Sequence, residues 1–552
     1  MGPRLVFVTG GVVSGLGKGV VAASLAKLLD ARGWSVSLIK IDPYLNPDPG
    51  TMNPVEHGEI FVTEEVWEFS PDPSISFKIA EIDEDFGHYE RFLGRDIHPM
   101  NNITSGQVML SVILRERRGE YLGRTVRLIP HVVEEVKRRI ELVEEREGPD
   151  VTVVEIGGTV GDYEALPFYE AARQMMSSRR AVHVHVTYLP FLETVGELKT
   201  KPAQVFVRMA REAGLPPDLL VARSHRAVDG GIRAKLALYS SLPPERVVVL
   251  PDVDPIYRVP LLLEEAGVGR ALEQALGLPR GEPDLSDLEA YLEMVEGASR
   301  EVRVAMVGKY WRMADAHISI SEALRHAAAH LGLRVREVRV DSEGLEKGEG
   351  WDLLSSSDGV VLLPGFGSRG AEGMIQAASW ALEDGRPTLG ICFGAQLSTV
   401  AFARTAMGWE GANSTEVDPS TPHPVVDLLP SQRAVRMKGG TMRLGAHKVY
   451  LEEGTILREA YGRPVVLERF RHRYHIVREA AEEMERAGYR VSAVDETGEI
   501  VNGFEVRGHP YFVGVQFHPE YRSRPWRPSP VYLSFLSSCL LYTSDAADDG
   551  ES

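Results

Sequence analysis

Short apolar runs alternate with helical segments through the first half of the chain. Residues 5–9 form one such run, residues 19–30 follow as a small-residue helix pattern behind a glycine-rich turn, and residues 36–41 form the next run. Similar runs recur at residues 151–156, 182–189, 219–222 and 246–250. This β-α-β order predicts a mostly parallel sheet with helices on both faces. We expect a first α/β domain over residues 1–267.

A second α/β pattern begins after a change in composition. Residues 268–300 are rich in proline, glycine and acidic side chains and contain one predicted helix, which is typical of a linker. Predicted strands at residues 302–307, 359–363 and 388–391, and a last one before His518, place the second domain at residues 301–539. Residues 66–82 and the small, acidic tail at 540–552 do not fit this order. We expect both to lie outside the catalytic cores, and we assign the tail no function.

Length, composition and charge narrow the class of protein. A chain of 552 residues is too long for one hydrophobic core, and it has no apolar run near the ~20 residues that span a bilayer. Its N-terminus lacks the features of a signal peptide, so we expect a cytoplasmic protein without membrane contact. The net charge of -18 argues against nucleic acid as a partner. Two distant cysteines, Cys392 and Cys539, do not predict a disulfide framework.

The segment GGVVSGLGKG at residues 10–19 predicts a phosphate site. It joins a strand to a helix, where backbone N–H groups can surround phosphate and Lys18 can neutralise its charge. An ordinary glycine-rich turn is the alternative, and the flanking strand and helix make it less favoured. Gly19 stands where a standard P-loop has the Ser or Thr that binds Mg²⁺, so the metal needs other oxygen ligands. Asp85 and Glu155 are the candidates, and Glu155 ends a predicted strand.

The segment TLGICFGAQL predicts a cysteine nucleophile in the second domain. Cys392 lies between an apolar strand and a helix, an arrangement that exposes a thiol near a helix N-terminus. His518 in VQFHPE can serve as the general base and Glu520 can orient it. A buried structural cysteine is the alternative reading of Cys392 taken alone. The backbone N–H groups of Phe393 and of the turn at residues 365–367 are candidate oxyanion donors.

Together these strings resemble the CTP synthase family from Phe7 to about Glu520. Further strings that carry the resemblance are IDPYLN, PGTMNP, EHGE, GHYERF, ERRGEYLG, EIGGTVGD, GELKTKP, DVDPIY, ANSTE, GGTMRLG and RHRY. The resemblance implies a P-loop-type amidoligase joined to a class I glutamine amidotransferase. In that family ATP phosphorylates O4 of UTP and ammonia from L-glutamine displaces the phosphate to give CTP. GTP acts as activator, CTP as feedback inhibitor, and a UTP site shared between subunits implies a homotetramer.

The resemblance also implies ligand sets. ATP is expected at Ser14, Gly15, Leu16, Gly17, Lys18, Lys40, Asp85, Asp252, Val253 and Asp254, with Mg²⁺ on Asp85 and Glu155. UTP or CTP is expected at Ser14, Asp162, Glu164, Lys199, Lys201, Gln204 and Lys235. Glutamine is expected at Gly365, Phe393, Gln396, Glu416 and Arg473, with Cys392, His518 and Glu520 as the triad.

Several positions depart from the family pattern. Pro364 replaces the first glycine of PGGFG and so removes an N–H from the predicted oxyanion turn. Ala203, Val205 and Phe206 replace more polar residues after LKTKP, and residues 66–82 interrupt the family's DGAETD stretch close to Asp85. Two other functions are open: another ATP-dependent amidotransferase such as a cobyrinate diamide synthase, against which LKTKP and DVDPIY argue, and a non-catalytic or ammonia-only protein, favoured only by Pro364.

Overall fold

The computed structural model divides the chain into two compact units. It describes residues 2–13, 15–194, 196–226, 228, 230–309, 311, 315–435 and 438–548. The first unit comprises Met1–Pro49 and Trp67–Leu292, and the second comprises Gly50–Val66 and Glu293–Ser552. Residues 268–292, expected in a linker, therefore count with the first unit. Residues 50–66, which lie in the N-terminal half of the sequence, count with the second.

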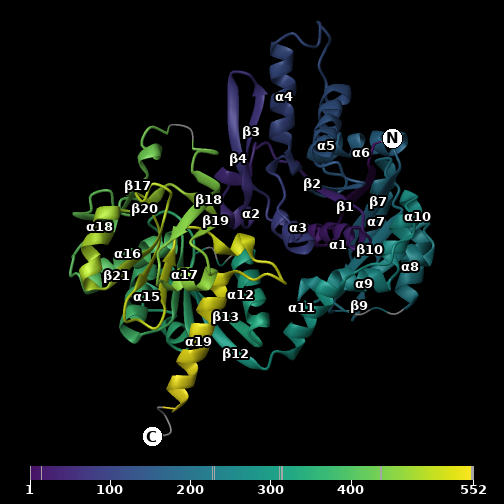
Figure 1. Ribbon diagram of the computed structural model, residues 1–552. Helices are drawn as coiled ribbons and strands as arrows, with labels where there is room; N and C mark the ends of the chain where they lie inside the picture. Colours follow the sequence, from purple (N-terminus) through teal and green to yellow (C-terminus); the bar gives the residue numbers. More distant parts are fainter. Residues whose placement is uncertain are drawn as a thin grey trace. The chain divides into compact units, whose positions relative to one another are not determined.

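A seven-stranded sheet forms the centre of the first unit (Figure 1). Its order is β11-β10-β7-β1-β6-β2-β5, and every pairing along it is parallel. The strands are β1 (Arg4–Gly10), β2 (Val36–Asp42), β5 (Asn102–Thr104), β6 (Val151–Ile156), β7 (Ala181–Tyr188), β10 (Leu219–Ser224) and β11 (Val247–Pro251). A separate two-stranded sheet pairs β8 (Phe191–Leu192) with β9 (Glu197–Leu198). The predicted parallel sheet is confirmed.

Helices cover both faces of this sheet, as predicted. Alternate strand residues such as Phe7 and Ile39 form one core with three helices: α4 (Ser105–Arg117), α5 (Val133–Glu147) and α6 (Leu166–Ser178). Their neighbours Val6 and Leu38 point the other way and are equally buried. The helix that follows the glycine-rich turn, α1 (Lys18–Asp30), packs on the sheet outside that core. The remaining helices are α3 (Asp85–Leu93), α7 (Lys201–Glu212), α8 (Gly230–Ser240), α9 (Val259–Glu265), α10 (Val268–Leu276) and α11 (Ser286–Gly297).

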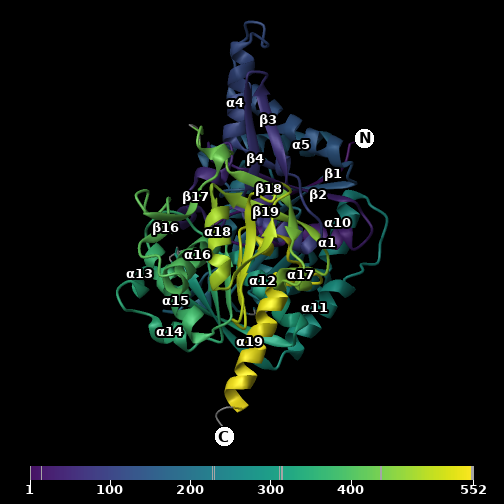
Figure 2. The ribbon, with the colours of Figure 1, turned by 60° about the vertical axis from the view of Figure 1, so that its left-hand side comes forward.

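Residues 66–82 form most of a long hairpin. Its strands are β3 (Phe61–Asp72) and β4 (Ile75–Ile82), joined by Pro73 and Ser74. Figure 2 shows the hairpin lying along α4, and Arg118 at the end of that helix pairs with Asp72 at 2.6 Å. Phe69 is buried, with the Arg139 guanidinium 4.8 Å from its ring centroid. The hairpin is therefore packed on the helices rather than loose.

A twelve-stranded mixed sheet forms the second unit. Parallel pairings run along β13-β12-β14-β15-β23, and the pairings from β23 through β22 and β20 to β17 are antiparallel. The strands are β12 (Arg300–Gly308), β13 (Leu333–Asp341), β14 (Gly359–Leu362), β15 (Thr388–Ile391), β16 (Ala412–Ser414), β17 (His423–Leu428), β18 (Arg443–Leu451), β19 (Val465–His472), β20 (Tyr474–Ile476), β21 (Tyr489–Val494), β22 (Val501–Val506) and β23 (Phe512–Val515). The expected second α/β fold is confirmed.

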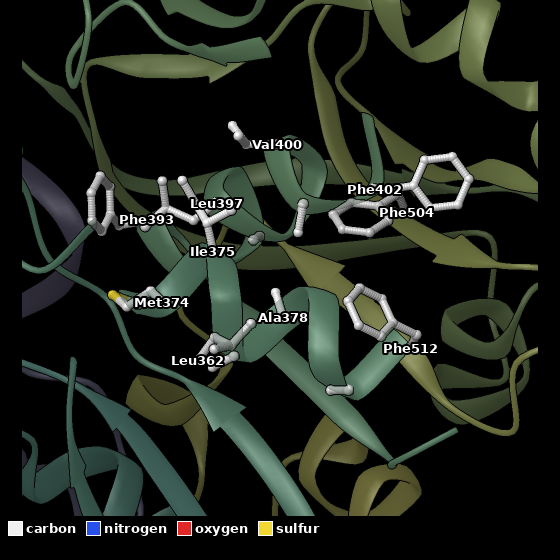
Figure 3. Packing of buried hydrophobic residues seen from close by; sticks show 14 of the residues in the cluster. Leu362, Met374, Ile375, Ala378, Phe393, Leu397, Val400, Phe402, Phe504 and Phe512 are labelled. Atoms are coloured by element: carbon white, nitrogen blue, oxygen red, sulfur yellow. The ribbon is translucent and has the colours of Figure 1, made fainter. Parts of the chain in front are cut away.

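Helices pack around this sheet and fix the cysteine-bearing turn. They are α2 (Pro54–His57), α12 (Ile318–His330), α13 (Ser342–Leu345), α14 (Trp351–Ser355), α15 (Ala371–Asp384), α16 (Phe393–Ala406), α17 (Ile456–Tyr461), α18 (Arg478–Met484) and α19 (Pro530–Asp548). Figure 3 shows Phe393 and Leu397 of α16 packed among side chains of β14 and α15. Because α16 is buried along its length, the residue before it has a fixed position.

The C-terminal helix continues through the change in composition at Leu540. Its first part is buried in the second unit through residues such as Tyr532 and Phe535, and Cys539 is also buried there. Residues 549–552 of the tail lie outside the described residues. Within the described chain neither cysteine is in a disulfide, and no helix has the length and apolar character needed to cross a bilayer.

Candidate active sites

Cys392 occupies a strained turn between β15 and α16. Its φ of 51° and ψ of -105° lie in a region that side chains rarely adopt, which is the signature of a nucleophile elbow. The neighbouring glycines permit this turn. A Cβ at Gly394 would come within 2.0 Å of the Leu362 carbonyl oxygen, and one at Gly390 within 2.9 Å of the backbone of Ala395. The two glycines of GICFGA are thus required by the backbone geometry.

His518 and Glu520 meet Cys392 in one cavity of the second unit. The Nδ1 atom of His518 lies 2.7 Å from Oε1 of Glu520, and all three side chains are buried. Burial alone would lower the pKa of His518, but the charges of Glu520 and Cys392 raise it to about 10. The imidazole is therefore oriented by Glu520, whose charge favours the protonated form.

The turn at residues 364–367 lies against the same cavity. Pro364, Gly365 and Phe366 line it, and Pro364 provides no N–H. The Gly367 N–H donates to Oε1 of Glu416 at 2.8 Å, so this N–H is not available to an oxyanion. The Phe393 N–H is among the first amides of α16 and has no partner within that helix. The Phe393 N–H therefore stays a candidate oxyanion donor, and the Gly367 N–H does not.

Lys309 holds this turn from the other side. Its Nζ donates to the carbonyl oxygens of Phe366 at 2.9 Å and Gly367 at 2.8 Å. Burial lowers the pKa of Lys309 to about 8, although Glu416 opposes the change. The pKa of Glu416 is raised by burial. The turn is thus clamped between a lysine and a carboxyl group.

The other predicted glutamine residues have structural partners nearby. Gln396 is buried and donates to the Tyr474 carbonyl oxygen and to Gln516 at 2.8 and 3.0 Å. Arg473 donates to Gln432 at 2.5 Å and to Thr441 at 3.0 Å. Unlike Gly365, neither Gln396 nor Arg473 lines the Cys392 cavity.

The sequence alone missed several residues of this cavity. Glu59, Ile60, Arg471 and Tyr521 line it, and Gln516 donates to the Cys392 sulfur at 3.5 Å. Gln516 could have been found, because it lies two residues before His518 at the end of an apolar strand. Nothing near Glu59 and Ile60 in the sequence indicates a cavity more than 300 residues further along the chain.

The predicted phosphate loop in the first unit follows β1. Gly17 has a φ of 80° directly before α1, and Nζ of Lys18 donates to the Gly158 carbonyl oxygen at 3.1 Å. Burial lowers the pKa of Lys18. Arg223 donates to the Leu16 carbonyl oxygen at 3.0 Å. Gly15 is also part of this turn, with a φ of 68°, whereas Ser14 lies outside the described residues.

Four carboxylates surround Lys40 next to this loop. Its Nζ lies 3.0 Å from Asp83, 3.5 Å from Glu155 and 3.9 Å from Asp42, and it also pairs closely with Asp85. Burial lowers the pKa of Lys40, but the carboxylates outweigh it, so the pKa lies well above its ordinary value. Burial raises the pKa of Glu155, a change that Lys40 opposes.

Asp85 lies directly against the start of α1. A Cβ at Gly19 would come within 1.8 Å of its Oδ1 atom. The Asp85 carboxylate therefore fills the space that a Ser or Thr side chain would take at position 19. The long hairpin before Asp85 does not remove it from the site. The two predicted metal ligands, Asp85 and Glu155, are brought together at Lys40.

The predicted nucleotide residues lie at other loops of the same unit. Asp252 pairs with Arg223 and His225, and Val253 and Asp254 follow it. Asp162 and Glu164 are exposed after β6, and Asp162 accepts from the Thr159 N–H at 2.8 Å. The remaining predicted residues lie near α7 and α8: Lys199, Lys201 and Gln204 at the start of α7, and exposed Lys235 on α8. Lys199 and Lys235 both lower the pKa of Glu197, first through the hydrogen bond from Lys199.

Two family models match this chain. The family model for the CTP synthase N-terminus matches residues 4–278, and the model for class I glutamine amidotransferase matches residues 312–538. Proteins named CTP synthase from Methanopyrus kandleri and Aeropyrum pernix are each 49% identical, covering 97% and 98% of this chain and 98% and 99% of their own. The Thermus thermophilus CTP synthase is 47% identical, with 99% of both chains covered.

A solved structure is also similar. It is the glutaminase domain of Trypanosoma brucei CTPS with bound acivicin, which is 35% identical and covers 43% of this chain and 94% of its own, with a TM-score of 0.41. Two family models together match nearly the whole chain, and relatives of the same name match it end to end. The chain therefore belongs to the CTP synthase family, whose members are glutamine-dependent C–N ligases.

Proposed function

We propose that this protein aminates UTP to CTP, using ATP and ammonia released from L-glutamine. The proposal rests on the presence of two sites in one chain. One is the Cys392–His518–Glu520 triad. The other is the phosphate loop with Lys18, beside which lie the carboxylates of Asp85 and Glu155. We assign the ligase chemistry to residues 1–267 and the glutaminase chemistry to residues 301–539.

In the glutaminase reaction, the Cys392 thiolate attacks the carboxamide carbon of glutamine. The negative charge on the oxygen is stabilised by the Phe393 N–H at the start of α16. Protonated His518 gives its proton to the leaving nitrogen, so that ammonia departs and a thioester remains. Water, deprotonated by His518, then releases glutamate and restores the thiolate. Gly365, Gln396, Glu416 and Arg473 are the proposed glutamine-binding residues.

In the ligase reaction, the γ-phosphoryl group of ATP passes to O4 of UTP. Ammonia then attacks C4, and inorganic phosphate leaves. Lys18 and the amides of residues 14–17 bind ATP phosphates, Lys40 neutralises charge beside them, and the 252–254 segment binds the rest of ATP. Asp162, Glu164, Lys199, Lys201, Gln204 and Lys235 are proposed to hold UTP or the inhibitor CTP. GTP as activator and a homotetrameric assembly are part of the same proposal.

The residues present fit a Mg²⁺ ion bound together with ATP. Mg²⁺ in nucleotide sites takes one or two carboxylates and completes its shell with phosphate oxygens and water. Asp85 and Glu155 supply that number, and Oε1 of Glu155 is buried with an ion pair to Lys40 at 3.5 Å but no hydrogen bond among the described residues. Within the described chain no group of three or more His, Cys, Asp or Glu side chains is arranged to hold a metal ion. When bound, the ion would neutralise charge on the transferred phosphoryl group.

One assay separates this proposal from the two alternatives. CTP formation is followed by the absorbance change from UTP, with ATP, Mg²⁺ and either ammonia or glutamine plus GTP. We expect product from both nitrogen sources. Product from neither would overturn the proposal and leave another amidotransferase or a non-catalytic protein, and product from ammonia alone would overturn the glutaminase half.

Substitution of the nucleophile tests the division of labour. Cys392→Ala should reduce glutamine-dependent CTP formation by at least roughly 1000-fold. The ammonia-dependent rate should stay unchanged, because it does not use the thiol. Cys539→Ala is the matched control, since Cys539 is also a buried cysteine outside any disulfide but lies in α19. Equal loss of both activities in Cys392→Ala would contradict the assignment.

A further inference from the structure

Residues 50–66 are fastened to the second unit at several points. Arg469, which is fully buried, donates to the Val62 carbonyl oxygen at 2.8 Å, and Arg522 pairs with Glu64 at 2.8 Å. The Ser319 hydroxyl and N–H both donate to the Glu59 carboxylate. This segment is therefore a fixed part of the unit that carries the cysteine.

The same segment forms a wall of the Cys392 cavity. Glu59 and Ile60 line that cavity together with Cys392 and His518. Glu59 is fixed by Ser319, whereas the Ile60 carbonyl oxygen accepts from Tyr521 Oη at 3.0 Å. Tyr521 is thus the contact between this wall and the turn that follows the catalytic histidine.

Tyr521 also packs on the imidazole itself. Its ring and that of His518 are stacked, with centroids 5.2 Å apart and an interplanar angle of 20°. The imidazole is also held by Glu520, whose carboxylate oxygen lies 2.7 Å from Nδ1. Phe61 meets the Tyr521 ring edge-on at 5.0 Å and limits its movement. The His518 ring plane is therefore set by Tyr521, and the Tyr521 ring is set by residues 60 and 61.

We propose that Tyr521 is a positioning residue of the glutaminase, which links residues 50–66 to the His518 imidazole through its ring stack and its hydroxyl bond to Ile60. The proposal rests on the glutaminase activity proposed above. Its consequence is that displacement of residues 50–66 would tilt the imidazole and slow glutamine hydrolysis. No such effect is expected on the ligase, because the contacts are confined to the second unit.

Tyr521→Phe tests the link because it keeps the ring and removes only the hydroxyl bond. We expect kcat for glutamine hydrolysis to fall roughly 3-fold to 10-fold, with KM for glutamine unchanged, since one buried hydrogen bond is lost and substrate contacts stay. Ammonia-dependent CTP formation should equal that of the wild type. Tyr532→Phe is the control, because Tyr532 is also buried in the second unit and its hydroxyl has no hydrogen-bond partner among the described residues.

A double-mutant cycle with Ser319→Ala distinguishes positioning from a general loss of packing. Ser319→Ala removes the hydroxyl bond to the neighbouring Glu59 and keeps the N–H bond, so it loosens the same segment, and the effects of the two changes on kcat should not multiply. Wild-type glutamine hydrolysis in Tyr521→Phe, or independent effects in the double mutant, would overturn the proposal. If the wild type hydrolyses no glutamine, the proposed function itself fails, which is a separate outcome.

Discussion

His518 is buried beside Glu520 and Cys392. Burial acts to lower its pKa, and the charges of Glu520 and Cys392 raise it to about 10 instead. A histidine with a raised pKa contributes stability that is fully present below its ordinary pKa of 6.5 and is lost as pH rises through about 10. The same proton is the one that the leaving ammonia needs. Stability and activity should therefore decline together at alkaline pH.

Glu520→Gln tests the origin of this pKa. Loss of the carboxylate charge should lower the pKa of His518, so the alkaline decline of kcat/KM for glutamine hydrolysis should move down by roughly 1–3 pH units. The measurement is a pH profile of glutamate release. Glu483→Gln, on the exposed face of α18, should leave the profile in place. An unchanged alkaline limb in Glu520→Gln would show that Glu520 does not set the pKa.

In the first unit, the missing side chain of Gly19 leaves room for the Asp85 carboxylate. Any side chain at this position would collide with the Asp85 carboxylate, whose oxygen lies 1.8 Å from the position of a Cβ. Gly19→Ser would make the loop more like a standard P-loop but would displace Asp85. We expect ammonia-dependent CTP formation to fall roughly 100-fold, because small displacements of reacting groups are costly.

Glutamine hydrolysis provides the internal control for Gly19→Ser and should not change. Gly297→Ser is the matched substitution, since a Cβ there meets nothing within 4 Å. Full ligase activity in Gly19→Ser would mean that Asp85 is free to move, and its assignment as a metal ligand would then lose its geometric basis.

At the scale of elements, the β3–β4 hairpin packs on the helices of the first unit from residue 67 onward. Phe69 is 4% exposed beneath Arg139, and Arg118 holds the hairpin tip through Asp72 and the Pro71 carbonyl oxygen. Phe69→Ala should destabilise the first unit by about 3 kcal/mol or more. Thermal unfolding by calorimetry should show this as a lower melting temperature, whereas Lys78→Ala on the exposed side of β4 should have no effect. No difference between the two variants would mean that the hairpin does not contribute to the core.

Elements that depend on nearby residues could be predicted from the sequence. The strand, turn and helix around Lys18 and around Cys392 follow from runs of apolar residues and glycines within about fifteen positions, and both are confirmed. For residues 66–82 the sequence shows only that they do not fit the alternation of strands and helices. Their alternation of apolar and polar residues about Pro73 and Ser74 is a hairpin pattern, but its packing on α4 depends on Arg118, which lies 46 positions from Asp72.

Contacts across long sequence separations could not be predicted. Lys40 was expected to contact ATP, and nothing in its neighbourhood showed that carboxylates from β2, from the start of α3 and from β6 would converge on it. Tyr521 follows a recognised motif, yet its partner Ile60 is 461 positions away. Such contacts are set by the tertiary fold, and local patterns carry no information about them.

At the scale of the whole molecule, the chain passes between its two units three times. It leaves the first unit at Pro49, returns at Trp67 and leaves again after Leu292. A boundary drawn from sequence alone, at residue 300, separates residues 50–66 from the unit in which they pack. The donors of the buried Arg469 and Tyr521 side chains would then lose their acceptors at Val62 and Ile60. Unsatisfied buried donors cost roughly 1–3 kcal/mol each.

A fragment that starts at residue 293 should therefore be an impaired glutaminase. We expect it to melt at a lower temperature than the second unit of the whole chain and to hydrolyse glutamine more slowly, because Glu59 and Ile60 no longer close the cavity. Joining residues 50–66 to the fragment through a flexible linker should restore part of both properties, whereas the same fusion carrying Phe61→Ala should restore less, since Phe61 is fully buried against Tyr521. Calorimetry and glutamate release measure the two effects. A fragment with the stability and rate of the whole chain would show that the second unit is complete without residues 50–66. The contacts of these residues with the second unit would then have no role in stability or glutamine hydrolysis.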